Sequence, residues 1–277
     1  MVGFGAVAFV FLAGLVTAIA TGLGAIPFFF FEDLADRWNV VLWGLASGIM
    51  VSASVFGLIF EGLAVGPVFG IVRVGGIPVP DGIGPGMLAG VVLVVVAHRI
   101  IDDYEVSPTR YEAADFKKLV LILGILTVHS FPEGVAVGVS FADLGFSGGI
   151  PLFGFAVPLL AVFMTVAISI HNVPEGVAIS IPLQAMEVSN WRMVWWAIFS
   201  SLPQPLGAVI AFYFVRIARQ FLPFGFGFAA GAMIYLVASE FIPEALEIGE
   251  GIPGGGRTEL LAGLVAGFAL MAPLALL

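Results

Sequence analysis

The sequence HSFPEGVA occupies residues 129–136 and returns as HNVPEGVA over residues 171–178, 42 positions later. Each copy lies inside a long apolar run and carries a histidine and a glutamate four residues apart. That spacing puts both side chains on one face of a helix, one turn apart. Ionisable side chains are costly at membrane depth and mark ion or substrate pathways. If the two faces meet, they offer two imidazole nitrogens and two carboxylates to one cation.

The composition is that of an integral membrane protein. Hydrophobic residues make up 60% of the chain, charged residues make up 10%, and the mean hydropathy is +1.13, whereas soluble domains are far more polar. The absence of cysteine excludes disulfides and thiolate metal ligands. The first apolar run begins at Val2 without a preceding basic segment, so it predicts a retained membrane helix and not a cleaved signal peptide.

Eight apolar runs are long enough to cross a hydrocarbon core of ~30 Å, which takes about 20 helical residues. The predicted fold is therefore an all-α integral membrane protein with a single domain, residues 1–277, and no soluble part. The eight predicted transmembrane helices are 4–27, 40–63, 84–101, 119–141, 156–184, 192–215, 225–247 and 259–277.

Basic residues in the connections predict the orientation in the membrane. With both termini outside, the outward connections hold only three basic residues: Arg73, Arg216 and Arg219. The inward connections then hold seven: Arg37, Arg99, Arg110, Lys117, Lys118, Arg192 and Arg257. The positive-inside rule favours this orientation, which we expect in a multi-pass protein of the plasma membrane.

Spans two and seven share a repeat with an offset of 183 residues. Because they run in opposite directions, the repeat is inverted, and the layout is 3+2+3, with the two motifs on the central pair. Inverted repeats with a site at the midplane are typical of secondary transporters. Glycines four positions apart on spans two, three, seven and eight predict close helix packing; the pairs are Gly44/Gly48, Gly86/Gly90, Gly227/Gly231 and Gly263/Gly267. The repeated residues are Gly44, Ala46, Gly48, Met50, Ile59, Glu61 and Leu63, which match Gly227, Ala229, Gly231, Met233, Ile242, Glu244 and Leu246.

Both motifs lie near the centres of their spans, the depth at which transporters hold their substrates. Pro132 and Pro174 each leave a carbonyl without its helical donor. Two imidazoles with two carboxylates suit a divalent first-row ion, Zn²⁺ foremost, with Cd²⁺, Fe²⁺, Mn²⁺ and Co²⁺ as alternatives. A structural hydrogen bond between two helices is the alternative for a single His–Glu pair, but it explains two copies at one depth less well.

The doubled H-x-x-P-E-G motif resembles that of the ZIP (Zrt/Irt-like) family of divalent metal transporters, and in particular its compact prokaryotic members. The stretches TGLGAIP over 21–27, QPLGA over 204–208 and AGAM over 230–233 carry the same resemblance. It implies uptake of Zn²⁺ or a related ion toward the cytoplasm through eight helices, with an elevator-like movement. The metal is then a transported substrate, and no cofactor is expected.

The resemblance also implies site residues on this sequence. The main transport site would consist of His129, Glu133, His171 and Glu175. A second, adjacent site in some members uses positions that here are Ser130, Asn172 and Gln204. Since span six carries a glutamine where such members carry an acid, we expect one metal with a weak or absent neighbour.

Four ionisable residues lie away from the centres of their spans. Glu61 is near the outer end of span two, and it is a candidate for an outer entrance. His98, at the inner end of span three, and Glu240 and Glu244, in the inner half of span seven, are candidates for an inner exit. The alternative for all four is a side chain that snorkels to the membrane interface.

Two other kinds of function are weighed against metal transport. An intramembrane enzyme would need H-E-x-x-H or repeated E-x-x-H, and neither spacing occurs, so no enzyme is expected. A proton- or sodium-coupled carrier of another solute could use the His–Glu pairs as proton relays. The expected partners are a divalent metal ion and the lipid bilayer, with no nucleic acid, and a homodimer is a candidate assembly.

Overall fold

The chain is mostly helical in the computed structural model, which describes residues 3–31, 34–65, 71–74, 77–80, 82–102, 129–146 and 149–275. The first part contains α1 (Phe4–Leu23), η1 (Ile26–Phe29), α2 (Asp36–Ser52), η2 (Ala53–Ile59), α3 (Phe60–Ala64), α4 (Ile83–Asp102) and a helical segment over 129–140. The second part contains α6 (Leu159–Ala185), α7 (Asn190–Ser200), α8 (Pro203–Ile217), η3 (Arg219–Phe221), α9 (Leu222–Leu236), η4 (Val237–Phe241), α10 (Ile242–Ile248), η5 (Gly249–Gly251) and α11 (Arg257–Ala275). Two antiparallel hairpins pair β1 (Ile71–Val74) with β2 (Ile77–Pro80) and β3 (Ile150–Leu152) with β4 (Phe155–Val157).

Six helical stretches among the described residues are long and apolar enough to cross a membrane, so the chain is a helical multi-pass membrane protein. They are Phe4–Phe29, Asp36–Ala64, Ile83–Ile100, Leu159–Gln184, Asn190–Ile217 and Arg219–Gly251, and they overlap six of the predicted spans. α11 overlaps the predicted span 259–277, and the segment 129–140 overlaps the predicted span 119–141, of which residues 119–128 lie outside the described residues. The total of eight spans stays a prediction.

One predicted span is divided. The run 192–215 is split into α7 and α8, because Pro203 begins a new helix. Proline has no amide hydrogen and is favoured at the first helical position, where no intrahelical donor is needed. The break places Gln204 at the start of α8, where it faces the motif on the segment 129–140.

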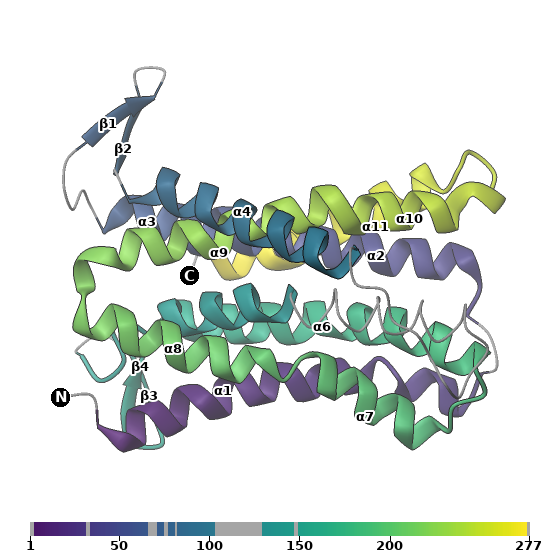
Figure 1. Cartoon of the computed structure of the whole chain (residues 1–277), viewed down its shortest axis with the longest axis horizontal. Helices are drawn as coiled ribbons and strands as arrows, with labels where there is room; N and C mark the ends of the chain where they lie inside the picture. The colour runs from purple at the N-terminus through teal and green to yellow at the C-terminus, as the bar shows by residue number, and fades with distance from the viewer. Residues whose placement is uncertain are drawn as a thin grey trace.

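The helices form two layers (Figure 1). The α2/α11 layer holds α2, α4, α9, α10 and α11, with α2 packed along α11 and α4 along α9. The α1/α6 layer holds α1, α6, α7 and α8, with α1 packed against the other three. The segment 129–140 belongs to the α1/α6 layer, because Gly134 and Gly138 pack against the backbone of α8. Contacts between α2 and α6 join the two layers.

Glycines bring helix backbones into contact in the α2/α11 layer. A Cβ on Gly48 would lie 2.1 Å from the carbonyl oxygen of Leu264 in α11, and one on Gly90 would lie 2.1 Å from that of Phe228 in α9. No side chain fits in such a space, so the predicted close packing of small-residue pairs is confirmed for these helices. The same layer contains further contacts of this kind at Gly44, Gly86, Gly227, Gly231, Gly263 and Gly267.

A π-helical turn interrupts each of the two long helices that the predicted repeat relates. η2 follows α2 and η4 follows α9, and the offset of 183 residues aligns η4 with residues 54–58 inside η2. π-helical turns are rare and frequently lie at functional sites. Here η4 ends with Glu240, which contacts His98, and Phe241, which stacks on His171.

Candidate metal centre

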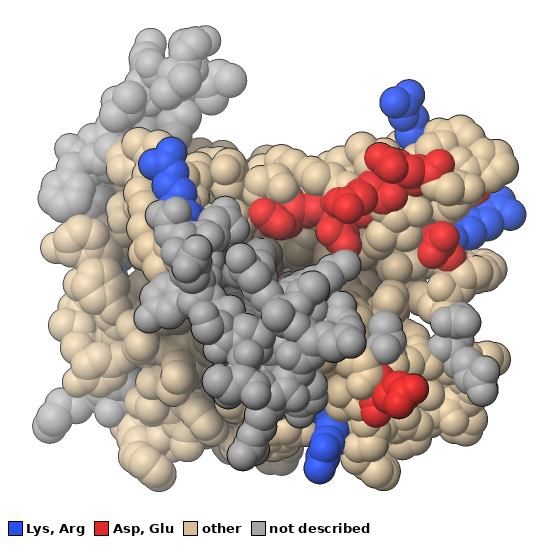
Figure 2. Space-filling model, turned by 45° about the vertical axis from the view of Figure 1, so that its right-hand side comes forward, with Lys and Arg blue, Asp and Glu red and all other residues tan. Residues whose placement is uncertain are grey.

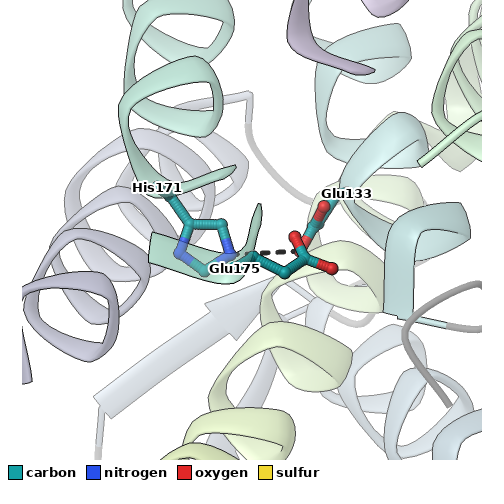
Figure 3. Close-up of side chains that lie close together, drawn as sticks. All are labelled: Glu133, His171 and Glu175. Atoms are coloured by element: carbon teal, nitrogen blue, oxygen red, sulfur yellow. Dashed lines mark ion pairs between the residues drawn. The ribbon is translucent and has the colours of Figure 1, made fainter. Parts of the chain in front are cut away.

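Three ionisable side chains meet between the segment 129–140 and α6. Glu133, His171 and Glu175 each offer a ligand atom, and these atoms all lie within 4.8 Å of one another. Figure 3 shows the imidazole of His171 and the two carboxylates pointing toward one another, with Nε2 of His171 at 3.3 Å from Oε1 of Glu133. All three side chains are at most 1% exposed. The arrangement combines one nitrogen and two carboxylates in a fully buried space.

The local sequence explains how these side chains come together. His171 and Glu175 stand one turn apart on α6, as the motif spacing predicts. The glycine that follows each glutamate lets a neighbouring backbone approach. A Cβ on Gly134 would lie 2.2 Å from the carbonyl oxygen of Gln204, and a Cβ on Gly176 would collide with the carbonyl of Thr21 in α1. The two glutamates are thereby held in the middle of the α1/α6 layer.

Most polar atoms of the three side chains make no hydrogen bond. Within the described part of the chain, Oε1 of Glu133, both carboxylate oxygens of Glu175 and both ring nitrogens of His171 are buried and make no hydrogen bond. A buried carboxylate without a partner is strongly destabilising. A divalent cation would neutralise both carboxylate charges and would be coordinated by these nitrogen and oxygen atoms. Imidazole with carboxylate is a donor set that binds Zn²⁺.

Two of the three predicted second-site residues, Asn172 and Gln204, form a hydrogen-bonded support for Glu133. Nε2 of Gln204 donates to Oε2 of Glu133 at 2.5 Å. Nδ2 of Asn172 donates to Oε1 of Gln204 at 3.1 Å and to the backbone oxygen of Thr17 at 2.7 Å. Ser130 is fully buried on the turn before Glu133. Gln204 therefore orients a candidate ligand, and its own side-chain oxygen is already in use.

His129 lies apart from the group of three. Its Nε2 is 3.1 Å from Nε2 of His98 on α4, and Nδ1 of His98 is 3.2 Å from Oε1 of Glu240 on η4. The structure thus brings together three of the four residues expected at the main site. It links the fourth to two of the residues expected at the inner exit.

The remaining expected residues lie farther along the same helices. Glu244 is exposed on α10, one turn beyond Glu240, and Glu247 and Glu250 follow it. Figure 2 shows acidic side chains in a row on the side where Figure 1 places α10. Glu61 is exposed on α3, near the end of the molecule where α1 begins. Glu61 does not belong to the group of three.

One aromatic residue beside this site was not predicted from the sequence. The ring of Phe241 is stacked on the imidazole of His171, with centroids 5.5 Å apart and planes at 14°. Phe241 lies in an apolar span among many other phenylalanines, so no sequence signal separates it from residues that face lipid or core. Its only cue is its position next to Glu240.

Comparisons with known proteins show which family this chain resembles. The model of the family described as "ZIP Zinc transporter" matches residues 101–275. "Zinc transporter GufA" of Myxococcus xanthus is 31% identical over 94% of this chain and 94% of its own length. "Zinc transporter ZIPB" of Bordetella bronchiseptica is 35% identical over 96% of this chain and 80% of its own length. "Putative zinc transporter At3g08650" of Arabidopsis thaliana is 42% identical over 84% of this chain, which spans only 34% of that longer protein.

Proposed function

Because this chain belongs to the ZIP zinc transporter family, we propose that it transports divalent metal ions, Zn²⁺ foremost, across a membrane toward the cytoplasm. The observation that carries the proposal is the buried group of Glu133, His171 and Glu175, whose ligand atoms all lie within 4.8 Å of one another. Members of the family are transporters and not enzymes, so the metal is a substrate and not a cofactor. Cd²⁺, Fe²⁺, Mn²⁺ and Co²⁺ suit the same donor set and are alternative substrates.

The main site in this proposal holds one ion. Glu133, His171 and Glu175 bind it first, and His129, one turn before Glu133, is the ligand that receives it next. The hydrogen bonds from Asn172 to Gln204 and from Gln204 to Glu133 support a single ion, because they occupy side chains that a second ion would need. Ser130, Asn172 and Gln204 then form only a weak second site.

The route inward follows the ionisable contacts. His129 contacts His98, and His98 contacts Glu240, so an ion that leaves the main site meets a nitrogen or a carboxylate at each step. Glu244 continues the row on α10. Glu61 marks the candidate entrance at the opposite end of the helices. The positive-inside rule favours an orientation with both termini outside, and the proposed location is the plasma membrane.

The packing of the two layers supports an elevator-like movement of the α1/α6 layer past the α2/α11 layer. Glycines join the backbones within the α2/α11 layer, whereas between the layers Gly57 of η2 faces the side chains of Phe163 and Met164. Side-chain contacts can rearrange during sliding more easily than interlocked backbones. The three candidate ligands lie in one layer, and His98 and Glu240 lie in the other.

Eight spans in a 3+2+3 order with an inverted repeat complete the proposed architecture. Two observations support the repeat. η2 and η4 occupy matching positions, and the glycine packing of α2 on α11 mirrors that of α9 on α4. The whole chain then acts as one domain in the lipid bilayer. A homodimer is the candidate assembly, and native mass spectrometry in detergent would detect it.

Uptake by the purified protein in liposomes tests the proposal. A fluorescent indicator inside the vesicles should report Zn²⁺ entry, and external Cd²⁺, Fe²⁺, Mn²⁺ or Co²⁺ should compete. The alternative is a proton- or sodium-coupled carrier that uses the His–Glu pairs as relays. Such a carrier would show neither Zn²⁺ entry nor selective thermal stabilisation by Zn²⁺ or Cd²⁺.

A further inference from the structure

An aromatic side chain from the α2/α11 layer lies against a candidate metal ligand in the α1/α6 layer. Phe241 is stacked on His171, with ring centroids 5.5 Å apart and planes at 14°. On another side Phe241 contacts the ring of Trp43 edge to face, at 4.9 Å and 66°. Phe241 is 1% exposed. A phenyl ring from η4 is thus held between α2 and the candidate site.

The stack takes the place of a contact that a metal-binding histidine usually has. A ligating imidazole normally donates its second ring nitrogen to a carboxylate or carbonyl, and that hydrogen bond fixes the ring plane. Nδ1 of His171 has no hydrogen-bond partner among the residues that the structure describes. Rotation about the bond that carries an imidazole ring is otherwise soft. The orientation of the His171 ring is therefore fixed by packing, and Phe241 is the neighbour that stacks on it.

The last two residues of η4 lie against all three histidines of the chain. Glu240 contacts His98, and Phe241, the next residue, stacks on His171 and lies 6.4 Å from the ring of His129. A phenyl ring offers no lone pair, so it does not compete with Glu133 and Glu175 for the cation. The face of a phenyl ring is electron-rich and tolerates the positive charge that a metal-bound imidazole carries.

We propose that Phe241 is a positioning residue that fixes the imidazole plane of His171 for metal binding. This inference rests on the proposed function, since it concerns a ligand of the same site. Because Phe241 and His171 belong to different layers, the stack exists only while the layers hold their present relative position. When the α1/α6 layer moves, His171 loses this support, and the site releases its ion more readily. The stack therefore couples metal affinity to the position of the layers.

The chain contains only three histidines, so NMR of histidine-labelled protein in detergent can follow each ring. In Phe241→Leu the ring protons of His171 should shift downfield as the ring current disappears. The Zn²⁺ affinity by isothermal titration should fall by about tenfold, the lower end of the range for lost outer contacts of a metal ligand. Phe241→Tyr keeps the aromatic ring and should stay close to wild type in both measurements.

Phe226→Leu is the matched control, because Phe226 is 2% exposed in the same layer. It should leave the signals of His171 and the affinity unchanged. Wild-type affinity in Phe241→Leu, with binding abolished in His171→Ala, would overturn the role of Phe241 and leave the transport site standing. Wild-type Zn²⁺ affinity in His171→Ala would instead overturn the site itself. Equal losses of affinity in Phe226→Leu and Phe241→Leu would reduce the role of Phe241 to general packing.

Discussion

Nε2 of His98 lies 3.1 Å from Nε2 of His129, so one imidazole donates a hydrogen bond to the other across the two layers. His98 is itself held by Glu240. His129 precedes Glu133 by one helical turn, yet its ring points toward the candidate exit. His129 thus shares a helix with the candidate ligand Glu133 while its ring contacts His98 in the other layer. In the proposed mechanism, this contact is the step from the main site to the inward route.

Replacing Glu175 with glutamine should separate metal binding from folding. Both oxygens of Glu175 are buried without a hydrogen-bond partner in the described residues, and Glu133 lies beside them. Replacing the acid by an amide should therefore relieve the repulsion between two buried carboxylates and stabilise the metal-free protein. The rise in melting temperature that Zn²⁺ gives the wild-type protein should disappear. Thermal unfolding with and without Zn²⁺ measures both effects. Glu250→Gln, at an exposed position on η5, should change neither, and a Zn²⁺ response retained in Glu175→Gln would remove Glu175 from the site.

Gln204 should determine how many ions bind. Gln204→Leu removes the donor to Glu133 and should weaken Zn²⁺ binding by about 10–100-fold, as is usual when an outer contact of a ligand is lost. Gln204→Glu adds a carboxylate and should raise the stoichiometry in isothermal titration from one ion to two. Gln184→Leu, near the end of α6, serves as the control. A single ion bound by Gln204→Glu would contradict the view that glutamine prevents a second site.

His98→Ala should impair transport more than binding. The three ligands remain intact, so the Zn²⁺ affinity should stay near wild type. Uptake into liposomes should fall by about tenfold, because His129 loses its partner on the inward route. Comparing titration with uptake on one preparation distinguishes the two effects. A parallel loss of affinity would make His98 a part of the main site and not of the exit.

Two glycines give opposite expectations for the same substitution. A Cβ on Gly48 would lie 2.1 Å from a backbone oxygen of α11, whereas nothing lies within 4 Å of a Cβ on Gly84 in α4. Gly48→Ala should therefore destabilise the protein by more than about 2 kcal/mol through overpacking. Gly84→Ala should be neutral or stabilising by up to about 1 kcal/mol. Thermal melting in detergent checks the pair, and equal melting temperatures would argue against interlocked backbones.

The features predicted correctly from the sequence are those that follow from hydropathy and from residue spacing along a helix. Apolar runs predicted the six long helices, because only helices satisfy their own backbone within lipid. The spacing of four residues predicted that His171 and Glu175 share a face. The copies of the motif on two helices predicted that Glu133 joins them, as the structure shows.

Other features depend on contacts between helices and could not be predicted from the sequence. The turn of His129 toward His98 depends on where α4 packs. Phe241 resembles every other apolar residue of its span until η4 directs it at His171. Which helices belong to each layer could not be predicted either, because helix faces that contact lipid and helix faces that contact protein are equally apolar. Only the glycine pairs, such as Gly44 and Gly48, indicated which faces lie together.

The most direct test of the central claim is Zn²⁺ uptake by the variant in which Glu133→Ala and Glu175→Ala are combined. The protein should insert and elute as the wild type does, because the apolar spans are unchanged. Its uptake in liposomes should fall to the level of vesicles without protein, since two of the three clustered ligands are gone. Uptake at the wild-type rate would contradict the assignment of the transport site to Glu133, His171 and Glu175.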